Sequence, residues 1–426
     1  MLDPVPSPAG VTRIEEVRTG DLLDLARRSP SGPLFFWSHP ESDREMLGLG
    51  VAAEIVTHGE DRLADAGRLA AAALACAGTP RGPVGAPLPR VVGGFAFDRE
   101  HPRTAGWRGF PALRLVVPTL LWIRERGRCW LVRSPELPSD RGPSRPVSAV
   151  DSRPACEPAP PPEQWMARVR SALEGIERGV LEKVVLTRTR SIAVTSTPEV
   201  ASFVSRLRAR RPGCFTYWMR GSGADFFGSS PELLVRVDGS TFATESIAGT
   251  AARGATPDED RRRVAALLAS DKNRREQATV SRAITDSLSA RVARLEIEPE
   301  VRVRSVPEAH HLATRFRGRL ESPVSVFEVA ALLHPTPAVC GTPTAAALEF
   351  IRRSDGERGW FTGAVGWMDT SGSGELAVAL RSGLVDGSAI TTAAGAGIVA
   401  GSDPVAEYEE TELKLQALQD ALEGAR

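Results

Sequence analysis

Two glutamates and a lysine near the end of the chain have a spacing that suits chemistry. In the segment AAGAGIVAGSDPVAEYEETELKL, Glu407, Glu410 and Lys414 stand at positions i, i+3 and i+7, so one helical face presents two carboxylates and an amine. Gly395 and Gly397 precede this helix and would let backbone N–H groups approach a ligand closely. A solvated Glu/Lys face after a flexible turn explains the segment equally well.

A further carboxylate, Glu276, lies in SDKNRREQATVSR (270–282) on a predicted helix. Carboxylates from two separate helices can share a hard cation, which prefers oxygen ligands. Taken alone, Glu276 is more simply interpreted as a surface residue in an arginine-rich stretch.

Lys183 and Glu232 are candidates for acid–base chemistry. KVVLTRTR (183–190) predicts a strand on which Lys183 and every second residue after it face one way. Such a lysine usually reaches solvent at a sheet edge, but in an enclosed pocket a neutral amine can act as a base. FFGSSPELLVRV places Glu232 at a strand start, where a polar turn residue is the ordinary case. A glutamate beside apolar strands can also be held protonated and act as an acid.

Composition excludes several functional classes. The 426 residues are 42% hydrophobic and 25% charged, which is typical of a globular protein of about two to four domains. Lys plus Arg (53) balances Asp plus Glu (53), so we expect no nucleic-acid partner. The five cysteines form no CxxC pair and the six histidines no HExxH or HxH spacing, which argues against disulfide and zinc sites. The His310–His311 pair is more often structural than catalytic.

Neither targeting nor membrane signals are present. MLDPVPSPAG lacks a charged stretch followed by an apolar core, and no apolar run approaches the ~18 residues of a membrane span. These features predict a cytoplasmic protein without a membrane segment.

The order of predicted elements indicates an α+β fold. A Pro/Ser/Ala-rich linker is predicted over 146–162. We expect one long helix over 257–292 and a closing helix over 404–425, with Asp403 as its N-cap and Pro404 at its first position. Turn signals predict β-hairpins at 116–132, 233–246 and 375–393. Adjacent hairpins with helices inserted between them give large antiparallel sheets.

Ordered motifs resemble those of one known family. KVVLTR, FFGSSPELLV, ESIAGTAARG, SDKNRREQ, HHLATRFRG, LHPTPAVCGTP, RGWFTGAVGWMD, GELAVALRSG and the tail segment resemble the successive motifs of the chorismate-utilising enzymes. That family contains isochorismate, salicylate, anthranilate and aminodeoxychorismate synthases. The match covers about residues 163–415.

The resemblance implies both a fold and a division of the chain. It implies large antiparallel β-sheets packed as a sandwich with helices on the outside. It assigns 163–426 to the chorismate-binding catalytic region and 1–150 to a variable N-terminal part of the same fold.

The resemblance also implies the reaction chemistry. Lys183 corresponds to the general base that acts on water, and Glu232 to the general acid that protonates the leaving hydroxyl. Magnesium is the implied cofactor, with Glu276 and Glu410 as direct ligands and Glu407 holding it through water. One carboxylate of chorismate would then be neutralised by the metal.

The implied substrate contacts are spread over several motifs. Arg381 corresponds to the arginine that grips the enolpyruvyl carboxylate, a role that suits a bidentate guanidinium. The other implied contacts to the substrate are Gly249, Thr250, His311, Phe361, Gly395, Gly397 and Lys414.

A few positions distinguish the subfamilies. Ala248 stands where aminodeoxychorismate synthases have a nucleophilic lysine, and Lys183 where anthranilate-type enzymes typically lack one, so water is the expected nucleophile. HPTPAVCGTP (334–343) and Phe361, which replaces the tyrosine of salicylate synthases, both favour an isochorismate synthase. Asn273 occupies a site where the family commonly has Asp or Glu, which predicts weaker metal affinity.

The sequence therefore predicts an isochorismate synthase, which converts chorismate to isochorismate by magnesium-dependent water addition and hydroxide loss. The alternative is a salicylate synthase, which goes on to eliminate pyruvate, and anthranilate-type amination ranks third. From a different class, a non-catalytic chorismate-binding subunit is disfavoured because Lys183, Glu232, Glu276 and Glu410 are all intact. We expect a monomer without a glutaminase subunit. Its product would serve siderophore, menaquinone or other secondary-metabolite biosynthesis, and the HPTPAVCGTP wording leans towards the siderophore type.

Overall fold

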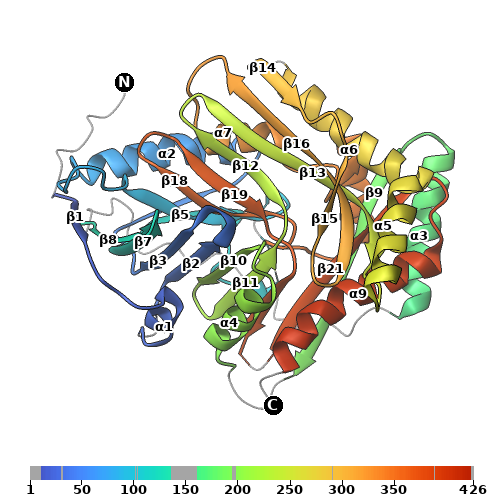
Figure 1. The fold of residues 1–426 in the computed structure, drawn as a ribbon, viewed down its shortest axis with the longest axis horizontal. Helices are drawn as coiled ribbons and strands as arrows, with labels where there is room; N and C mark the ends of the chain where they lie inside the picture. The colour runs from blue at the N-terminus through green and yellow to red at the C-terminus, as the bar shows by residue number, and fades with distance from the viewer. Residues whose placement is uncertain are drawn as a thin grey trace.

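Two large β-sheets face each other, and helices cover their outer sides (Figure 1). The computed structural model describes residues 11–29, 32–100, 102, 104–135, 161–193, 198–289, 291–387 and 389–423. Most of the predicted linker at 146–162 lies outside these residues, and helix α3 begins at its end, at Pro162.

The first sheet contains strands from both ends of the chain. Within the described residues it has eleven strands in the order β1-β8-β7-β3-β2-β10-β11-β20-β21-β9-β17, and its named strands pair antiparallel. Their bounds are β1 Arg13–Glu16, β2 Leu34–His39, β3 Arg44–Leu49, β7 Leu120–Glu125, β8 Arg128–Arg133, β9 Lys183–Ala193, β10 Phe215–Arg220, β11 Ala224–Ser230, β17 Gly341–Thr342, β20 Ser382–Asp386 and β21 Ala389–Val399.

The second sheet is built in the same way. Its described strands run in the order β14-β16-β13-β12-β19-β18-β5-β6-β4, with β15 also paired to β16, and all these pairs are antiparallel. Their bounds are β4 Ala53–Thr57, β5 Arg90–Phe95, β6 Leu113–Val117, β12 Leu233–Asp238, β13 Thr241–Ala252, β14 Val292–Ile297, β15 Arg302–Ser305, β16 Ala309–Leu320, β18 Ala364–Asp369 and β19 Gly374–Val378.

Alternating side chains explain how these sheets pack. On β10, Phe215, Tyr217 and Met219 enter the core between the two sheets, whereas Trp218 faces the helices outside, as the period of two of a β-strand requires. Helices α1 (Leu22–Arg27) and α4 (Val200–Arg210) pack on the outer face of the first sheet. This arrangement confirms the predicted α+β sandwich with outer helices.

The remaining helices cover the second sheet and the β9–β21 end of the first. Helices α2, α6 and α7 contribute apolar side chains to the core beside the second sheet, while α3 and α9 pack on β21. Their bounds are α2 Arg62–Cys76, α3 Pro162–Glu177, α5 Pro257–Ala269, α6 Asp271–Ser289, α7 Val326–Leu333, α8 Thr344–Ser354 and α9 Pro404–Glu423. Among the described residues, no helix combines the length and apolar character needed to span a membrane.

Early and late parts of the chain share both sheets. Strand β2 pairs with β10 in the first sheet, and β5 pairs with β18 in the second. Residues before 136 therefore contribute strands to the same two sheets as the region from 163 onward.

The predicted hairpin turns and the closing helix are confirmed, but the first residues of the hairpins predicted at 116–132 and 375–393 belong to β6 and β19 of the second sheet. The hairpins β7–β8, β12–β13 and β20–β21 form around Gly127, Gly239 and Gly387, each with positive φ. Asp403 caps α9, because its Oδ1 accepts hydrogen bonds from the backbone N–H groups of Val405 and Ala406 at 3.1 and 2.9 Å.

The single helix predicted over 257–292 is wrong. The structure has two helices, α5 and α6, which meet at Ser270, a residue with extended backbone (φ −71°, ψ 115°). Ser270 Oγ accepts a hydrogen bond from the backbone N–H of Asn273 at 3.3 Å, so it caps the start of α6. At the other end, Val292 already belongs to β14. A serine cap inside a continuous helical pattern is the signal that the sequence interpretation overlooked.

Candidate active site

One cavity collects most of the predicted site residues. It lies among β13, β16, β21, α6 and α9, and its volume is about 80 Å³. Two predicted residues, Lys183 and Glu407, do not line it but are buried behind its wall, each about 1% exposed. The predicted residues that line it are Glu232, Gly249, Thr250, Glu276, His311, Phe361, Arg381, Gly395, Gly397, Glu410 and Lys414.

Lys183 reaches the cavity wall from β9. Its Nζ lies 3.0 Å from Oε1 of Glu276. The neighbouring strand β21 presents Gly397 at this point, and a Cβ atom there would lie 2.5 Å from Glu276 Oε1 and 3.0 Å from Lys183 Cε. The missing side chain of Gly397 therefore makes room for the Lys183–Glu276 pair.

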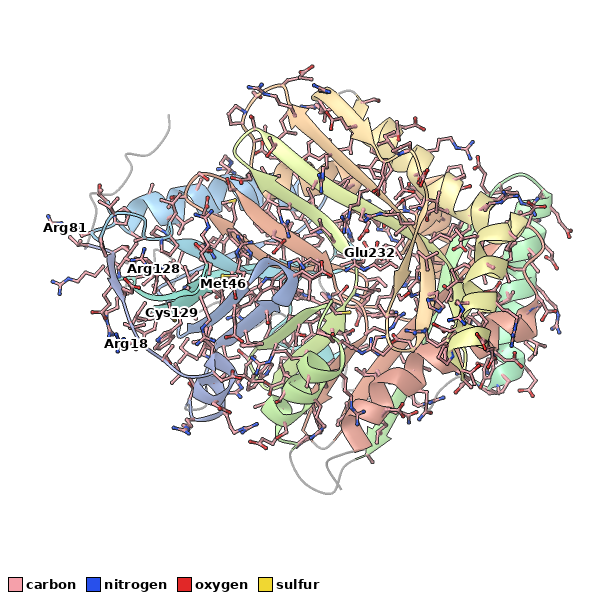
Figure 2. All side chains as sticks on the ribbon, viewed as in Figure 1. Arg18, Met46, Arg81, Arg128, Cys129 and Glu232 are labelled. Atoms are coloured by element: carbon pink, nitrogen blue, oxygen red, sulfur yellow. The ribbon has the colours of Figure 1, made fainter. Side chains whose placement is uncertain are left out.

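Glu232 lies in the short connection between β11 and β12, near the centre of the molecule (Figure 2). It is 4% exposed. Burial raises its pKa to about 8, and the nearby charge of Glu245 acts in the same direction, while Lys183 acts against both. Glu232 is therefore protonated at neutral pH and can donate a proton.

Each predicted metal-ligating carboxylate is held by a lysine. Besides the Lys183–Glu276 pair, Lys272 Nζ bonds Glu407 Oε1 at 2.5 Å. Lys414 Nζ bonds Glu410 Oε1 at 2.6 Å and the carbonyl oxygen of Gly395 at 2.8 Å. Among the described residues, no three His, Cys, Asp or Glu side chains are grouped so as to hold a metal ion.

Lys272 nevertheless marks a position suited to a cation. Burial works against its charged form, but the pull of three carboxylates, first Glu407 and then Glu410 and Glu276, raises its pKa. An ammonium group thus stands where the fields of three carboxylates add. Carboxylate oxygens are the donors that magnesium prefers, so the donor set and its charge fit this ion.

Arg381 enters the cavity where the chain passes from one sheet to the other. It lies between β19 and β20 and has positive φ (48°), as does Thr362 (63°), another residue of the lining. Backbone strain of this kind is often found at functional sites. Arg381 Nε donates to Glu308 Oε1 at 3.0 Å, and Arg211 Nη1 donates to the same oxygen at 2.9 Å.

Glu308 is the carboxylate that holds the guanidinium of Arg381 in position. Burial would raise the pKa of Glu308, but the charges of Arg381 and Arg211 outweigh it and lower the pKa to about 2. Glu308 is therefore ionised and holds the Arg381 guanidinium in place.

His311 and Thr250 form a neutral polar side of the cavity. His311 Nδ1 lies 3.2 Å from Thr250 Oγ1. Burial, together with the charges of Arg381 and Lys414, lowers the pKa of His311 to about 3. The imidazole is therefore neutral at pH 7, where it can form hydrogen bonds but carries no charge.

A β-bulge turns backbone N–H groups towards helix α6. Gly249 has positive φ (74°), and the register of β13 against β16 shifts there. Its N–H donates to Glu276 Oε2 at 3.1 Å, and the N–H of Thr250 donates to Asn273 Oδ1 at 3.3 Å. Asn273 thus bonds the backbone beside the Glu276 carboxylate and offers an amide oxygen there instead of a second carboxylate.

Most of the remaining lining is apolar, although Thr362 also lines the cavity, with its hydroxyl donating to the carbonyl oxygen of Phe361 at 2.6 Å. Phe361, 4% exposed, takes the position discussed for a tyrosine. The HPTPAVCGTP segment contributes Ala338 and Val339 to the wall, and no tyrosine is among the described residues of the lining.

Sequence reasoning missed two residues of this site, Lys272 and Glu308. Lys272 precedes Glu276 by four positions on α6, which places both on one helical face, so a signal was present. Glu308 is 73 positions from Arg381, and no local pattern marks their contact.

The arrangement can support acid–base chemistry on a dianionic substrate. The site contains a buried acid, Glu232, and a buried amine, Lys183, and the charge of Lys183 acts against the effect of burial on the pKa of Glu232. Arg381 and Lys414 offer positive charge to carboxylates, and the neutral, largely apolar walls would strengthen those interactions.

Comparisons with known proteins identify the family of this chain. Residues 9–423 match the family model described as chorismate binding enzyme. The chain is 34% identical over 415 residues to the salicylate biosynthesis isochorismate synthase of Pseudomonas aeruginosa, covering 92% of this chain and 85% of that protein. It is 28% identical over 437 residues to the isochorismate synthase MenF of Bacillus subtilis, with coverage of 97% and 93%. The solved structure of MenF, the menaquinone-specific isochorismate synthase of Escherichia coli, has a TM-score of 0.80 and 26% identity, with coverage of 98% and 95%.

Proposed function

Because the chain belongs to the chorismate-binding enzyme family, we propose that it is an isochorismate synthase that converts chorismate into isochorismate. The observation that carries this proposal is the pairing of a buried acid with a buried amine around one cavity. Glu232 keeps its proton at neutral pH because burial raises its pKa to about 8, and Lys183 lies close by behind the Glu276 carboxylate. The names of the similar proteins agree with this reaction.

The reaction adds water at one ring carbon and expels the hydroxyl from another. Lys183 in its neutral form takes a proton from the incoming water, whose oxygen bonds to the ring. Glu232 gives its proton to the departing hydroxyl, which leaves as water. One water enters and one leaves, so the substrate is isomerised without net hydration. General acid–base catalysis of this kind contributes roughly 10²–10⁴-fold in rate.

The substrate would be held by the cationic side of the cavity. Arg381, fixed by Glu308, binds the enolpyruvyl carboxylate through its remaining N–H groups. Lys414 lies on the same cavity and adds a second positive charge. Neutral His311 and Thr250 supply hydrogen bonds to uncharged oxygens without competing for the carboxylates.

Magnesium is the proposed cofactor, held by Glu276 and Glu410 directly and by Glu407 through water. When bound, it would supply positive charge that neutralises one substrate carboxylate. Because Asn273 offers no carboxylate here, we expect weaker magnesium affinity than in a variant that carries an acidic residue at position 273.

Product analysis tests the proposal. Purified protein with chorismate and magnesium should accumulate isochorismate, detected by chromatography. Lys183→Ala and Glu232→Gln should each lower kcat by roughly 10²–10⁴-fold while chorismate still binds, whereas Glu300→Gln, at an exposed position, should leave it unchanged. Near-normal turnover in both site variants would contradict the assigned roles.

The second candidate, a salicylate synthase, differs in the fate of the enolpyruvyl group. Pyruvate elimination requires this group to be held in a pose where it can take a ring hydrogen. Phe361 packs but cannot donate a hydrogen bond, so the pose beside Arg381 is less constrained. Stoichiometric salicylate and pyruvate from the unmodified protein would establish the salicylate synthase instead.

We further propose that the product serves siderophore or menaquinone biosynthesis, because the similar proteins are named for salicylate or menaquinone routes. Deletion of the gene should then be rescued by the isochorismate-derived end product of whichever of these two routes the enzyme supplies. We also propose a cytoplasmic monomer that works without a glutaminase subunit. Light scattering would measure the mass, and glutamine should not alter the product.

A further inference from the structure

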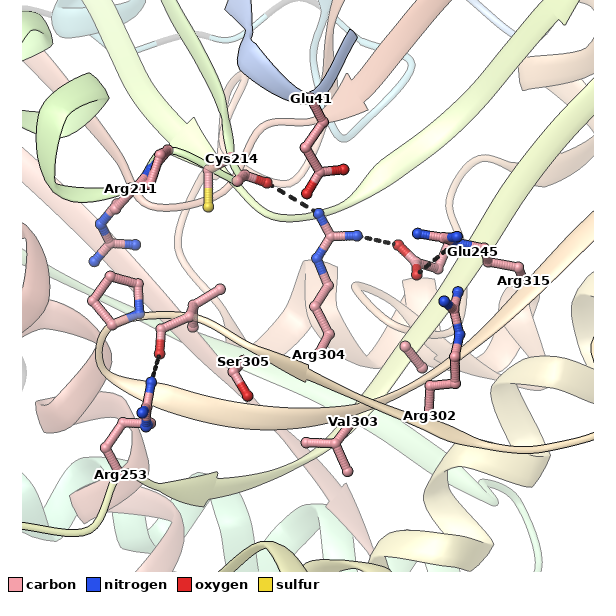
Figure 3. Close-up of a pocket in the computed structure, with 15 residues that line it drawn as sticks. Glu41, Arg211, Cys214, Glu245, Arg253, Arg302, Val303, Arg304, Ser305 and Arg315 are labelled. Atoms are coloured by element: carbon pink, nitrogen blue, oxygen red, sulfur yellow. Dashed lines mark hydrogen bonds and ion pairs between the residues drawn. The ribbon is translucent and has the colours of Figure 1, made fainter. Parts of the chain in front are cut away.

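A second, larger cavity lies next to the candidate active site. Its volume is about 450 Å³, within the range of about 300–1,000 Å³ that small-molecule sites usually have. Strand β15, the loop before β10 and residues of β13 and β16 enclose it (Figure 3). It shares none of its lining residues with the first cavity.

The lining is rich in arginine. Five arginines and two glutamates face the space, together with apolar residues such as Val303, Val306 and Pro307. The charged residues are Arg211, Arg253, Arg302, Arg304, Arg315, Glu41 and Glu245.

Glu245 is the carboxylate around which three of these arginines gather (Figure 3). Arg304 donates to it at 2.6 Å and also binds the carbonyl oxygen of Gly213 at 3.2 Å. Arg315 reaches Glu245 only at 3.8 Å and remains 43% exposed. The Glu245 carboxylate is therefore shared by the guanidinium groups of Arg304 and Arg315. Most N–H donors of Arg315 remain available to a ligand.

Arg302 leaves donors at the rim. It pairs through Nε with Glu298 at 2.8 Å and is 38% exposed. A guanidinium has five N–H donors, so this single carboxylate partner does not saturate it. Arg253 is more fully engaged, because it bonds both oxygens of Asp260 and, through Nη1, the carbonyl oxygen of Val306.

An ion-pair chain joins this cavity to the substrate cavity. Arg211 lines the second cavity and bonds Glu308 Oε1, and the same oxygen bonds Arg381, which lines the first cavity. Glu245 adds a second connection, because its charge helps to raise the pKa of Glu232. A charge bound in the second cavity would therefore change the electrostatic potential at Arg381 and at Glu232.

We propose that the second cavity is a binding site for a small organic carboxylate, whose occupancy changes turnover at the neighbouring active site. The Arg315 and Arg302 guanidinium groups bind the carboxylate, and the valine and proline walls contact the apolar body of the ligand. The coupling runs through Arg211 and Glu308 to Arg381.

Phthalate, which carries two carboxylates on a compact ring, is a suitable probe. Calorimetry on the full chain should give one phthalate site that persists in Arg381→Lys, because Arg381 does not line the second cavity and lysine keeps a positive charge beside Glu308. Arg302→Gln and Arg315→Gln should each weaken binding about tenfold or more, since a charge-assisted hydrogen bond contributes roughly 1.5–3 kcal/mol. Arg294→Gln, a surface arginine on β14 that is 75% exposed, is the matched control and should bind as the unmodified protein does.

Kinetics then separates the two cavities. Phthalate should change kcat for chorismate, and excess substrate should not overcome this effect. In Arg302→Gln, phthalate should no longer change kcat relative to the rate of that variant without phthalate. The proposal is overturned if phthalate does not bind, if both arginine variants bind it as well as Arg294→Gln does, or if inhibition is purely competitive. Because binding is measured without turnover, failure of the proposed isochorismate synthase activity would leave the calorimetric result interpretable.

Discussion

Replacing Gly397 by alanine should damage catalysis while sparing the fold. The added Cβ would lie 2.5 Å from Glu276 Oε1 and 3.0 Å from Lys183 Cε, whereas ordinary contacts begin at 3.4 Å. Glu276 must therefore move by about 0.9 Å, and Lys183 moves with it. A displacement of this size at reacting groups can cost about 10²-fold in rate, so we expect kcat to fall by about that factor.

Stability should change little, because alanine in a strand is favoured over glycine by roughly 0.5–1 kcal/mol and the contacts are with movable side-chain ends. The assay is isochorismate formation at saturating chorismate and magnesium, together with a thermal melt. Gly356→Ala, where a Cβ meets nothing within 4 Å, is the control and should keep full activity. If Gly397→Ala retains kcat within threefold of the unmodified protein, the Lys183–Glu276 geometry does not control the reaction.

Five further predictions concern pH, metal and product. Activity should decline as pH rises through about 8, where Glu232 loses its proton. Because that folded pKa lies above the ordinary 4.5, the contribution of Glu232 to the free energy of unfolding falls as the pH rises from 4.5 to about 8. Urea melts should therefore show that the stability of the unmodified protein, relative to Glu232→Gln, decreases over this pH range. EDTA should abolish activity, and magnesium should restore it. Calorimetry should show tighter magnesium binding in Lys272→Met, because this variant removes a competing ammonium group. Unchanged magnesium affinity would refute that competition. Phe361→Tyr should raise the salicylate fraction slightly by chromatography; no change would argue against a role for that hydroxyl.

The local features of this protein were predictable because neighbouring residues produce them. The hairpin turns at Gly239 and Gly387 follow from Asp-Gly signals between β-rich runs, and Asp403 caps α9 as a short polar residue before a helix does. The ordered motifs likewise identified the family and the candidate residues. The break at Ser270 was also a local signal, but the continuous helical pattern on both sides concealed it.

The sequence by itself determined which chemical groups the site contains, and the tertiary structure decided which of them meet. The partnership of Lys183 with Glu276 depends on how α6 packs beside the β9–β21 pair, where Gly397 leaves the necessary space. The protonation of Glu232 depends on burial between segments distant in sequence, and the hold of Glu308 on Arg381 spans 73 positions. Strand register and sheet packing fix these distances, and both are collective properties of the folded chain that no short segment specifies.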